Sequence, residues 1–152
     1  MQIAEIDFCK PGDADSLFAI ERACFDLPWE KHVIEYDLEN QGLVAYVKAT
    51  LKDEVAGYAV LSRGDGVSHL LNIAVLPQFQ RQGIAKQLML AAEALSEDWG
   101  YRRMKLEVRS SNRVARDFYA GIGFVYHARQ RGYYVNGEDA LILVARLPLK
   151  IV

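Results

Sequence analysis

The 152-residue sequence has few of the residues on which metal and disulfide proteins depend, with two cysteines and three histidines. Cys9 and Cys24 have neither the CxxC spacing of a metal or redox site nor the density of a secreted disulfide scaffold. We interpret both as small core residues. His32, His69 and His127 stand far apart in the sequence without the short spacing of metal ligands, so no metal site is predicted.

The sequence also lacks a basic surplus and long apolar runs. Its net charge is −2 and its pI is about 5.9, whereas binding to a phosphate backbone needs a large positive surplus. Apolar stretches such as residues 70–76 are far shorter than the roughly 20 residues of a membrane span, and the acidic start of the chain is unlike a secretory signal. We expect no direct nucleic-acid partner, no membrane insertion, a cytoplasmic location, and a monomer or weak dimer.

What is present is a globular composition, with 51% hydrophobic and 25% charged residues. The length suits one domain, which we expect to span residues 1–152. Alternating apolar residues predict strands, and apolar residues three and four positions apart predict helices. The predicted order, β-α-α-β-β-β-α-β-α-β-β, indicates an α+β fold bordering on α/β. Strands are predicted at 3–8, 43–51, 55–61, 67–75, 104–108, 124–129 and 140–145, and helices at 13–25, 29–39, 83–98 and 112–122.

The same spacing predicts details within three of these helices. Asp13 or Asp15 lies in a favourable position to cap the first helix. The second helix places Val33, Tyr36 and Asp37 on neighbouring turns. The apolar side of the 112–122 helix consists of Val114, Ala115, Phe118 and Ile122.

The clearest chemical feature is the turn after the 67–75 strand, because a strand followed by a glycine-containing turn and a helix points free backbone N–H groups at an anion. Small residues at Gly83 and Ala85 would let a pyrophosphate approach the amides, and Arg81 and Lys86 add positive charge. Taken alone, the segment could equally be a plain turn in which glycine relieves steric crowding. Neither GxGxxG nor GK[ST] is present, which argues against Rossmann and P-loop sites. The turn consists of Gln80, Arg81, Gln82, Gly83, Ile84 and Ala85.

This turn resembles the Q/R-x-x-G-x-G/A signature of the GNAT superfamily of N-acetyltransferases, with Ala85 where many members have glycine. Other segments are similar to its RimI-type branch, whose members acetylate the N-termini of ribosomal proteins. The resemblance implies the GNAT fold, a central mixed and mostly antiparallel sheet of about seven strands flanked by four helices, and it implies acetyl-CoA as co-substrate. These segments are Pro28-Trp29, residues 69–75, residues 106–112, Phe118-Tyr119, Gly123-Phe124, residues 131–134 and residues 137–140.

The resemblance also implies the catalytic residues. A protein α-amino group has a pKa of about 7.7–8.0, so a base is needed to deprotonate it near pH 7. Glu107 occupies the position of the family's base, and Tyr119 that of the acid which protonates the departing CoA thiolate. Without the resemblance, Glu107 would be interpreted as a surface carboxylate paired with Arg102 or Arg109, and Tyr119 as a core aromatic. Because Phe118 suits the core better, we expect Tyr119 to be free for catalysis.

Binding residues are implied in the same way. The strand backbone at residues 73–75 would pair with pantetheine and polarise the thioester. Asn112 is a candidate N-cap and also matches a family residue that contacts the cofactor. The predicted acetyl-CoA contacts are Ile73, Ala74, Val75, Arg81, Gln82, Gly83, Ile84, Ala85, Lys86 and Asn112. The candidate walls of the acceptor groove are Leu27, Pro28, Trp29, Tyr133 and Tyr134.

We therefore predict direct acetyl transfer in a ternary complex. A covalent intermediate is not predicted, because Cys9 and Cys24 belong to the first strand and helix, away from the motifs. The predicted acceptor is a protein N-terminus, such as the N-terminal alanine of a ribosomal protein. Two alternatives stay open: a small-amine acetyltransferase that acts on a polyamine, antibiotic or amino acid, and a catalytically silent acyl-CoA-binding module. The presence of both Glu107 and Tyr119 argues against the silent module.

Overall fold

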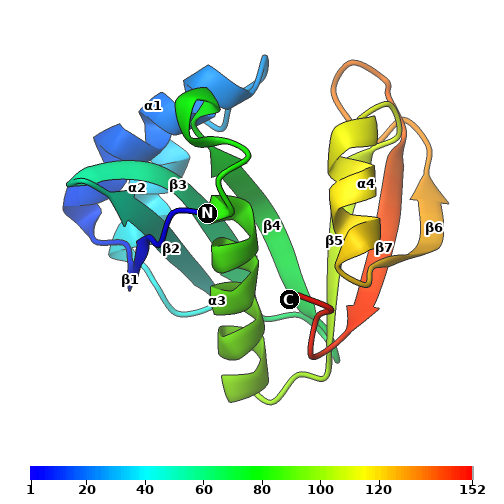
Figure 1. Ribbon diagram of the computed structural model, residues 1–152. Coiled ribbons are helices and arrows are strands. Elements are labelled where there is room, and N and C mark those ends of the chain that lie inside the picture. The colour runs from blue at the N-terminus through cyan, green and yellow to red at the C-terminus, as the bar shows by residue number, and fades with distance from the viewer. Residues whose placement is uncertain (152) are drawn as a thin grey trace. The chain divides into compact units, whose positions relative to one another are not determined.

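The computed structural model describes residues 1–151. Within that range, seven strands form a mixed sheet in the order β1-β2-β3-β4-β5-β7-β6, accompanied by four α-helices (Figure 1). The α+β architecture expected from the sequence is confirmed. The strands are β1 (Glu5–Phe8), β2 (Val44–Leu51), β3 (Glu54–Ser62), β4 (Ser68–Val75), β5 (Arg103–Arg109), β6 (Val125–Gln130) and β7 (Ala140–Arg146). The helices are α1 (Ala14–Cys24), α2 (Lys31–Glu39), α3 (Ile84–Asp98) and α4 (Arg113–Gly121).

Residue contacts divide the described chain into two compact units. Unit 1 comprises Met1–Ser62 and Asn72–Ala92. Unit 2 comprises Arg63–Leu71 and the described residues from Glu93 onward. In the same residues, 1–151, no helix has both the length and the apolar character needed to cross a membrane.

Unit 1 is built on the antiparallel strands β1, β2 and β3. Lys52 and Asp53 connect β2 to β3 and both have positive φ, as expected for a tight hairpin turn that matches the strand twist. The helices α1 and α2 lie beside these strands (Figure 1). Cys24 packs against the buried core, and Cys9 lies inside it, so its predicted core position is confirmed. The core cluster contains Cys9, Ala14, Leu17, Ile20, Ile34, Leu38, Tyr46, Tyr58, Val60 and Ala74.

Two details of α1 and α2 go beyond what the sequence predicted. Asp13 is the N-cap residue of α1, as predicted, but its side chain makes no capping hydrogen bond, because its carboxylate accepts the Lys10 N–H and pairs with Lys48 Nζ at 2.9 Å. In α2, the buried residues are Ile34 and Leu38, whereas the predicted Val33 and Tyr36 are exposed. An i, i+4 pair was enough to fix the buried face of this short helix, and the residues beside that pair face water.

Unit 2 is organised around β5. The first part of β4 runs parallel to β5 with His69 opposite Lys105, and β7 pairs antiparallel with both β5 and β6. The helix α4 runs alongside β5 and β7 (Figure 1). Its predicted face was also wrong in part, because Val114 is 83% exposed and Tyr119, not Phe118, is the buried residue of the helix.

Candidate active site

The turn between β4 and α3 lies in unit 1. It contains a short 3-10 helix, Pro77–Phe79, and two residues with positive φ, Arg81 and Gly83. The Gln80 side-chain amide donates a 3.0 Å hydrogen bond to the Val75 carbonyl and closes the turn. This backbone path brings the chain into α3 at Ile84, and the N–H groups in the first turn of a helix have no partner within the helix. The segment is thus a strand-to-helix turn of the kind that binds anions.

Gly83 has a backbone conformation that favours glycine. Its φ of +83° is unfavourable for any residue with a side chain, and an added Cβ would lie 3.0 Å from Met1 Cγ. The N-terminal segment is held over the turn by a hydrogen bond from Gln2 N–H to the Gln82 carbonyl. The side chain that glycine omits would therefore meet Met1, and the positive φ also favours glycine at this position.

The end of β4 supplies residues 73–75, the predicted backbone contacts. A Cβ on Gly57 would lie 2.7 Å from the Ala74 carbonyl oxygen, so the backbones approach closely at this point. The Val75 carbonyl accepts hydrogen bonds from Gln80 and from Cys24 Sγ, the latter at 3.2 Å. Because these protein donors use both lone pairs, the Val75 carbonyl has no lone pair left for a cofactor amide.

The predicted acceptor wall in unit 1 follows α1. Leu27 is exposed, whereas Trp29 is half-buried and packs against the core cluster. The Trp29 backbone N–H donates a 2.9 Å hydrogen bond to Glu21 Oε1, and the Asn72 side-chain amide donates a 2.7 Å hydrogen bond to Glu21 Oε2. Sequence reasoning missed Glu21. The available signal was its position within the apolar stripe of α1, four residues after Leu17.

Glu107 lies in unit 2 on β5, and its carboxylate is hydrogen-bonded to His69 on β4. The distance from Glu107 Oε1 to His69 Nε2 is 2.7 Å, and the two side chains are only 15% and 20% exposed. An ionised carboxylate can only accept, so Nε2 carries the hydrogen and donates it. The alternative of an ion pair with Arg109 is not what the structure has, because Arg109 contacts Glu138 at 3.2 Å. His69 was missed because the sequence does not reveal that β4 and β5 are neighbours.

Tyr119 lies on α4 with its ring buried between Phe118 and Phe124. The ring centroids are 5.4 Å and 5.6 Å apart in edge-to-face contacts. Burial, with a smaller contribution from Tyr134, raises the pKa of Tyr119 well above its usual range. The phenol therefore holds its proton through neutral pH, as a general acid must. It is more enclosed than the sequence indicated.

The loop between β6 and β7 carries the other two predicted acceptor residues, Tyr133 and Tyr134. The guanidinium of Arg109 lies 3.9 Å from the Tyr134 ring centroid and also contacts Glu138. Burial, followed by the neighbouring Glu107 carboxylate, raises the pKa of Tyr133. In unit 2, Glu107 therefore lies close enough to Tyr133 and Tyr134 to influence their pKa values. The contacts of Arg109 with Tyr134 and Glu138 anchor the loop to β5.

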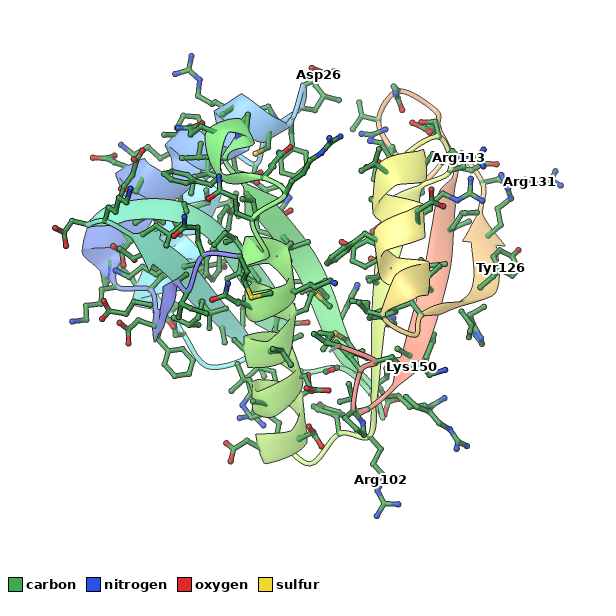
Figure 2. All side chains as sticks on the ribbon, in the orientation of Figure 1. Asp26, Arg102, Arg113, Tyr126, Arg131 and Lys150 are labelled. Carbon is green, nitrogen blue, oxygen red and sulfur yellow. The ribbon has the colours of Figure 1, made fainter. Side chains whose placement is uncertain are left out.

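Asn112 caps α4, as predicted, because its Oδ1 accepts the Ala115 N–H at 3.1 Å. Arg113, labelled in Figure 2, is the first residue of the helix and marks this end. In the part of the chain that the structure describes, no three His, Cys, Asp or Glu side chains are grouped to hold a metal ion.

Comparison with known proteins places these features in a family. The family model described as "Acetyltransferase (GNAT) family" matches residues 14–124. The ribosomal protein bS18-alanine N-acetyltransferase of Haemophilus ducreyi is 35% identical over 140 residues, which cover 89% of this chain and 94% of that protein. The N-alpha-acetyltransferase of Sulfurisphaera tokodaii is 31% identical over 153 residues, covering 89% and 88%. The crystal structure of the ribosomal-protein-S18-alanine N-acetyltransferase from Escherichia coli matches with a TM-score of 0.84 and 29% identity, over 95% of this chain and 94% of that one.

Proposed function

Because this chain belongs to the acetyltransferase (GNAT) family, we propose that it transfers the acetyl group of acetyl-CoA to the N-terminal amine of a protein. The proposed acceptor is a ribosomal protein that begins with alanine, in the cytoplasm. Two observations support this choice: the relatives act on bS18 alanine or are named N-alpha-acetyltransferases, and the candidate acceptor residues are apolar or aromatic rather than acidic.

Acetyl-CoA would be held in part by the turn of unit 1. The exposed side chains of Arg81 and Lys86 flank the start of α3, where they can pair with phosphate oxygens while the first-turn amides donate to them. The residues present therefore fit an anionic cofactor. Asn112 is also proposed to contact acetyl-CoA, because it matches a cofactor-contacting position of the family. The backbone of residues 73–74 is proposed to bind pantetheine.

The proposed catalytic roles rest on the hydrogen bond between Glu107 and His69. Glu107 would accept a proton from the ammonium group of the acceptor, and His69 would hold the carboxylate in place by donating to its Oε1. The freed amine nitrogen then forms a bond to the thioester carbonyl carbon. We therefore propose Glu107 as general base and His69 as its positioning residue.

Collapse of the tetrahedral intermediate breaks the carbon–sulfur bond and releases a thiolate. We propose that Tyr119 donates its phenolic proton to that sulfur, since its phenol is protonated at neutral pH and the family's acid occupies this position. The nitrogen of the intermediate gives up its second proton to the Tyr119 phenolate, and Glu107 releases the first to solvent, so the products are the acetylated amine and CoA thiol. Both substrates would be bound together, so proximity supplies part of the acceleration.

A panel assay tests the proposal. The protein is mixed with acetyl-CoA and, separately, with peptides beginning with Ala, Ser or Met, and with spermidine and free amino acids, and release of CoA thiol is followed. Peptide-dependent release, strongest with N-terminal alanine, is expected. Release only with small amines would replace the protein acceptor by a small amine, and tight acetyl-CoA binding without release to any acceptor would remove the enzymatic role.

A further inference from the structure

The segment between α1 and α2 is tied to β4 by one buried carboxylate. Glu21 is 1% exposed and lies among the buried residues of α1, although its side chain carries a carboxyl group. Its Oε1 accepts the Trp29 backbone N–H at 2.9 Å, and its Oε2 accepts the Asn72 side-chain amide at 2.7 Å. Asp26, labelled in Figure 2, lies in the same connecting segment. The carboxylate therefore bridges the Trp29 segment and β4 within unit 1.

The partners of Glu21 are neutral donors. Besides the two amides, the Tyr58 hydroxyl lies near this carboxylate and accepts a 3.1 Å hydrogen bond from Asn72. Burial, and then the charge of Glu21, raises the pKa of Tyr58 far above its usual range, so the phenol stays a donor. Burying a carboxyl group costs free energy that an apolar residue at the same place would not, so its hydrogen bonds must offset that cost.

The two hydrogen bonds that Glu21 accepts explain why a carboxyl group is buried at this position. The Trp29 backbone N–H belongs to the segment of residues 27–29, and its hydrogen bond fixes the backbone from which the Trp29 indole packs on the core. Asn72 immediately precedes residues 73–75 on β4. An apolar residue at position 21 could fill the same space but could not hold both donors.

We propose that Glu21 is a positioning residue that sets the place of the 27–29 segment for acceptor binding, by bridging Trp29 to Asn72. This inference rests on the proposed function for its kinetic consequence. Its structural consequence, the ordering of Trp29, does not depend on any activity.

Glutamine at position 21 tests the bridge. Its Oε1 can still accept from Trp29, but its Nε2 would face the Asn72 amide, donor against donor. The swapped pair, Glu21→Gln with Asn72→Asp, restores a donor opposite an acceptor without changing the number of heavy atoms. Glu93→Gln is a matched control, because Glu93 is also a buried carboxylate that accepts a backbone N–H, from Leu149, in unit 2.

The first readout is fluorescence. The chain contains two tryptophans, so Trp99→Phe leaves Trp29 as the sole tryptophan, which is excited selectively at a wavelength that tyrosine does not absorb. In that background, Glu21→Gln is expected to raise acrylamide quenching of Trp29 about twofold or more, the swapped pair to return it to the starting value, and Glu93→Gln to leave it unchanged. Unchanged quenching in Glu21→Gln, or a swapped pair that quenches like the single variant, would overturn the bridge.

The second readout is the KM for an acceptor peptide. Loss of a hydrogen bond to a charged group corresponds to a rise of about tenfold in this KM, with kcat and acetyl-CoA affinity nearly unchanged. The swapped pair should recover the wild-type KM. If wild-type protein acetylates no peptide, the proposed function fails and fluorescence alone decides the bridge. If wild-type protein is active but Glu21→Gln only lowers Tm, with peptide KM unchanged, Glu21 serves stability and the inference fails.

Discussion

His69 Nε2 and Glu107 Oε1 lie 2.7 Å apart on the parallel strands β4 and β5. This hydrogen bond joins the proposed base to a residue that sequence reasoning had considered only as a metal ligand. It gives Glu107 a fixed orientation in a mostly enclosed position, and it predicts separate effects for changes at the two residues.

Replacement of the base should remove chemistry and leave binding intact. Glu107→Gln keeps the shape and the hydrogen bond from His69 but cannot take a proton, so kcat should fall by about 10²–10⁴-fold. The acetyl-CoA Kd, measured by isothermal titration calorimetry, should change less than about twofold. A wild-type kcat across the pH range would remove Glu107 from the mechanism.

Replacement of the positioning residue should have a smaller effect. His69→Phe preserves an aromatic ring but removes the donor to Glu107, and we expect kcat to fall about tenfold with acetyl-CoA affinity retained. His69→Gln, which can still donate through its amide, should recover part of the loss. Equal activity in wild-type and His69→Phe proteins would contradict the positioning role.

If Tyr119 is the general acid, the dependence of kcat on pH should reveal it. Because burial raises the pKa of the phenol, the proton is kept at pH values where an ordinary tyrosine, with a pKa of about 10, has begun to lose it. The kcat of the wild-type protein should therefore not decline between about pH 8 and 10. Tyr119→Phe should lower kcat by about 10²-fold at all these pH values. A decline in wild-type kcat centred below about pH 10 would contradict the assignment, as would full activity of Tyr119→Phe.

The turn is tested by paired glycine variants. Gly83→Ala and Gly100→Ala both introduce a side chain at a positive φ, +83° and +94°, and should each cost about 1 kcal/mol of stability. Only Gly83→Ala should weaken acetyl-CoA, by about tenfold, because only that turn is proposed to bind the pyrophosphate. Equal acetyl-CoA affinities in the two variants would reject the turn as the cofactor site.

Stability in acid should depend on Asp13. Burial by itself would raise the pKa of Asp13, but hydrogen bonds from the Lys10 N–H and from Lys48 outweigh it and lower the pKa. A lowered folded-state pKa stabilises the fold above the unfolded value of about 3.9 and loses this contribution as the pH falls through the folded value. Asp13→Asn should therefore lower Tm by roughly 2–4 °C at pH 7. The difference should shrink below about pH 4, and a constant difference in thermal melts from pH 7 to 2 would contradict this account.

Much of the fold could be predicted because the local spacing of apolar residues indicates most of its helices and strands. The order of strands and helices followed from apolar spacing, and the Asn112 cap from its place before α4. The helix faces were harder: in α2 the buried Ile34 and Leu38 were passed over for Val33 and Tyr36, since the faces of a short helix differ little in composition.

The site contains residues that no local pattern reveals. His69 meets Glu107 because β4 lies parallel to β5, although they are separated in sequence by α3. Glu21 meets Asn72 across 51 positions. Both contacts depend on which strands and helices become neighbours, and that is decided by packing of the whole chain rather than by any segment. The family signature supplied Glu107 and Tyr119, whereas their supporting residues required the structure.

The central claim, transfer of acetyl from acetyl-CoA to a protein α-amine, is tested most directly by locating the product. A peptide with a free N-terminal alanine and one internal lysine is incubated with protein and acetyl-CoA, and tandem mass spectrometry locates the acetyl group. The account predicts acetylation on the alanine α-amine, and none on a matched peptide whose N-terminus is blocked. Acetylation on the lysine, or an unmodified peptide under conditions where spermidine is acetylated, would contradict it.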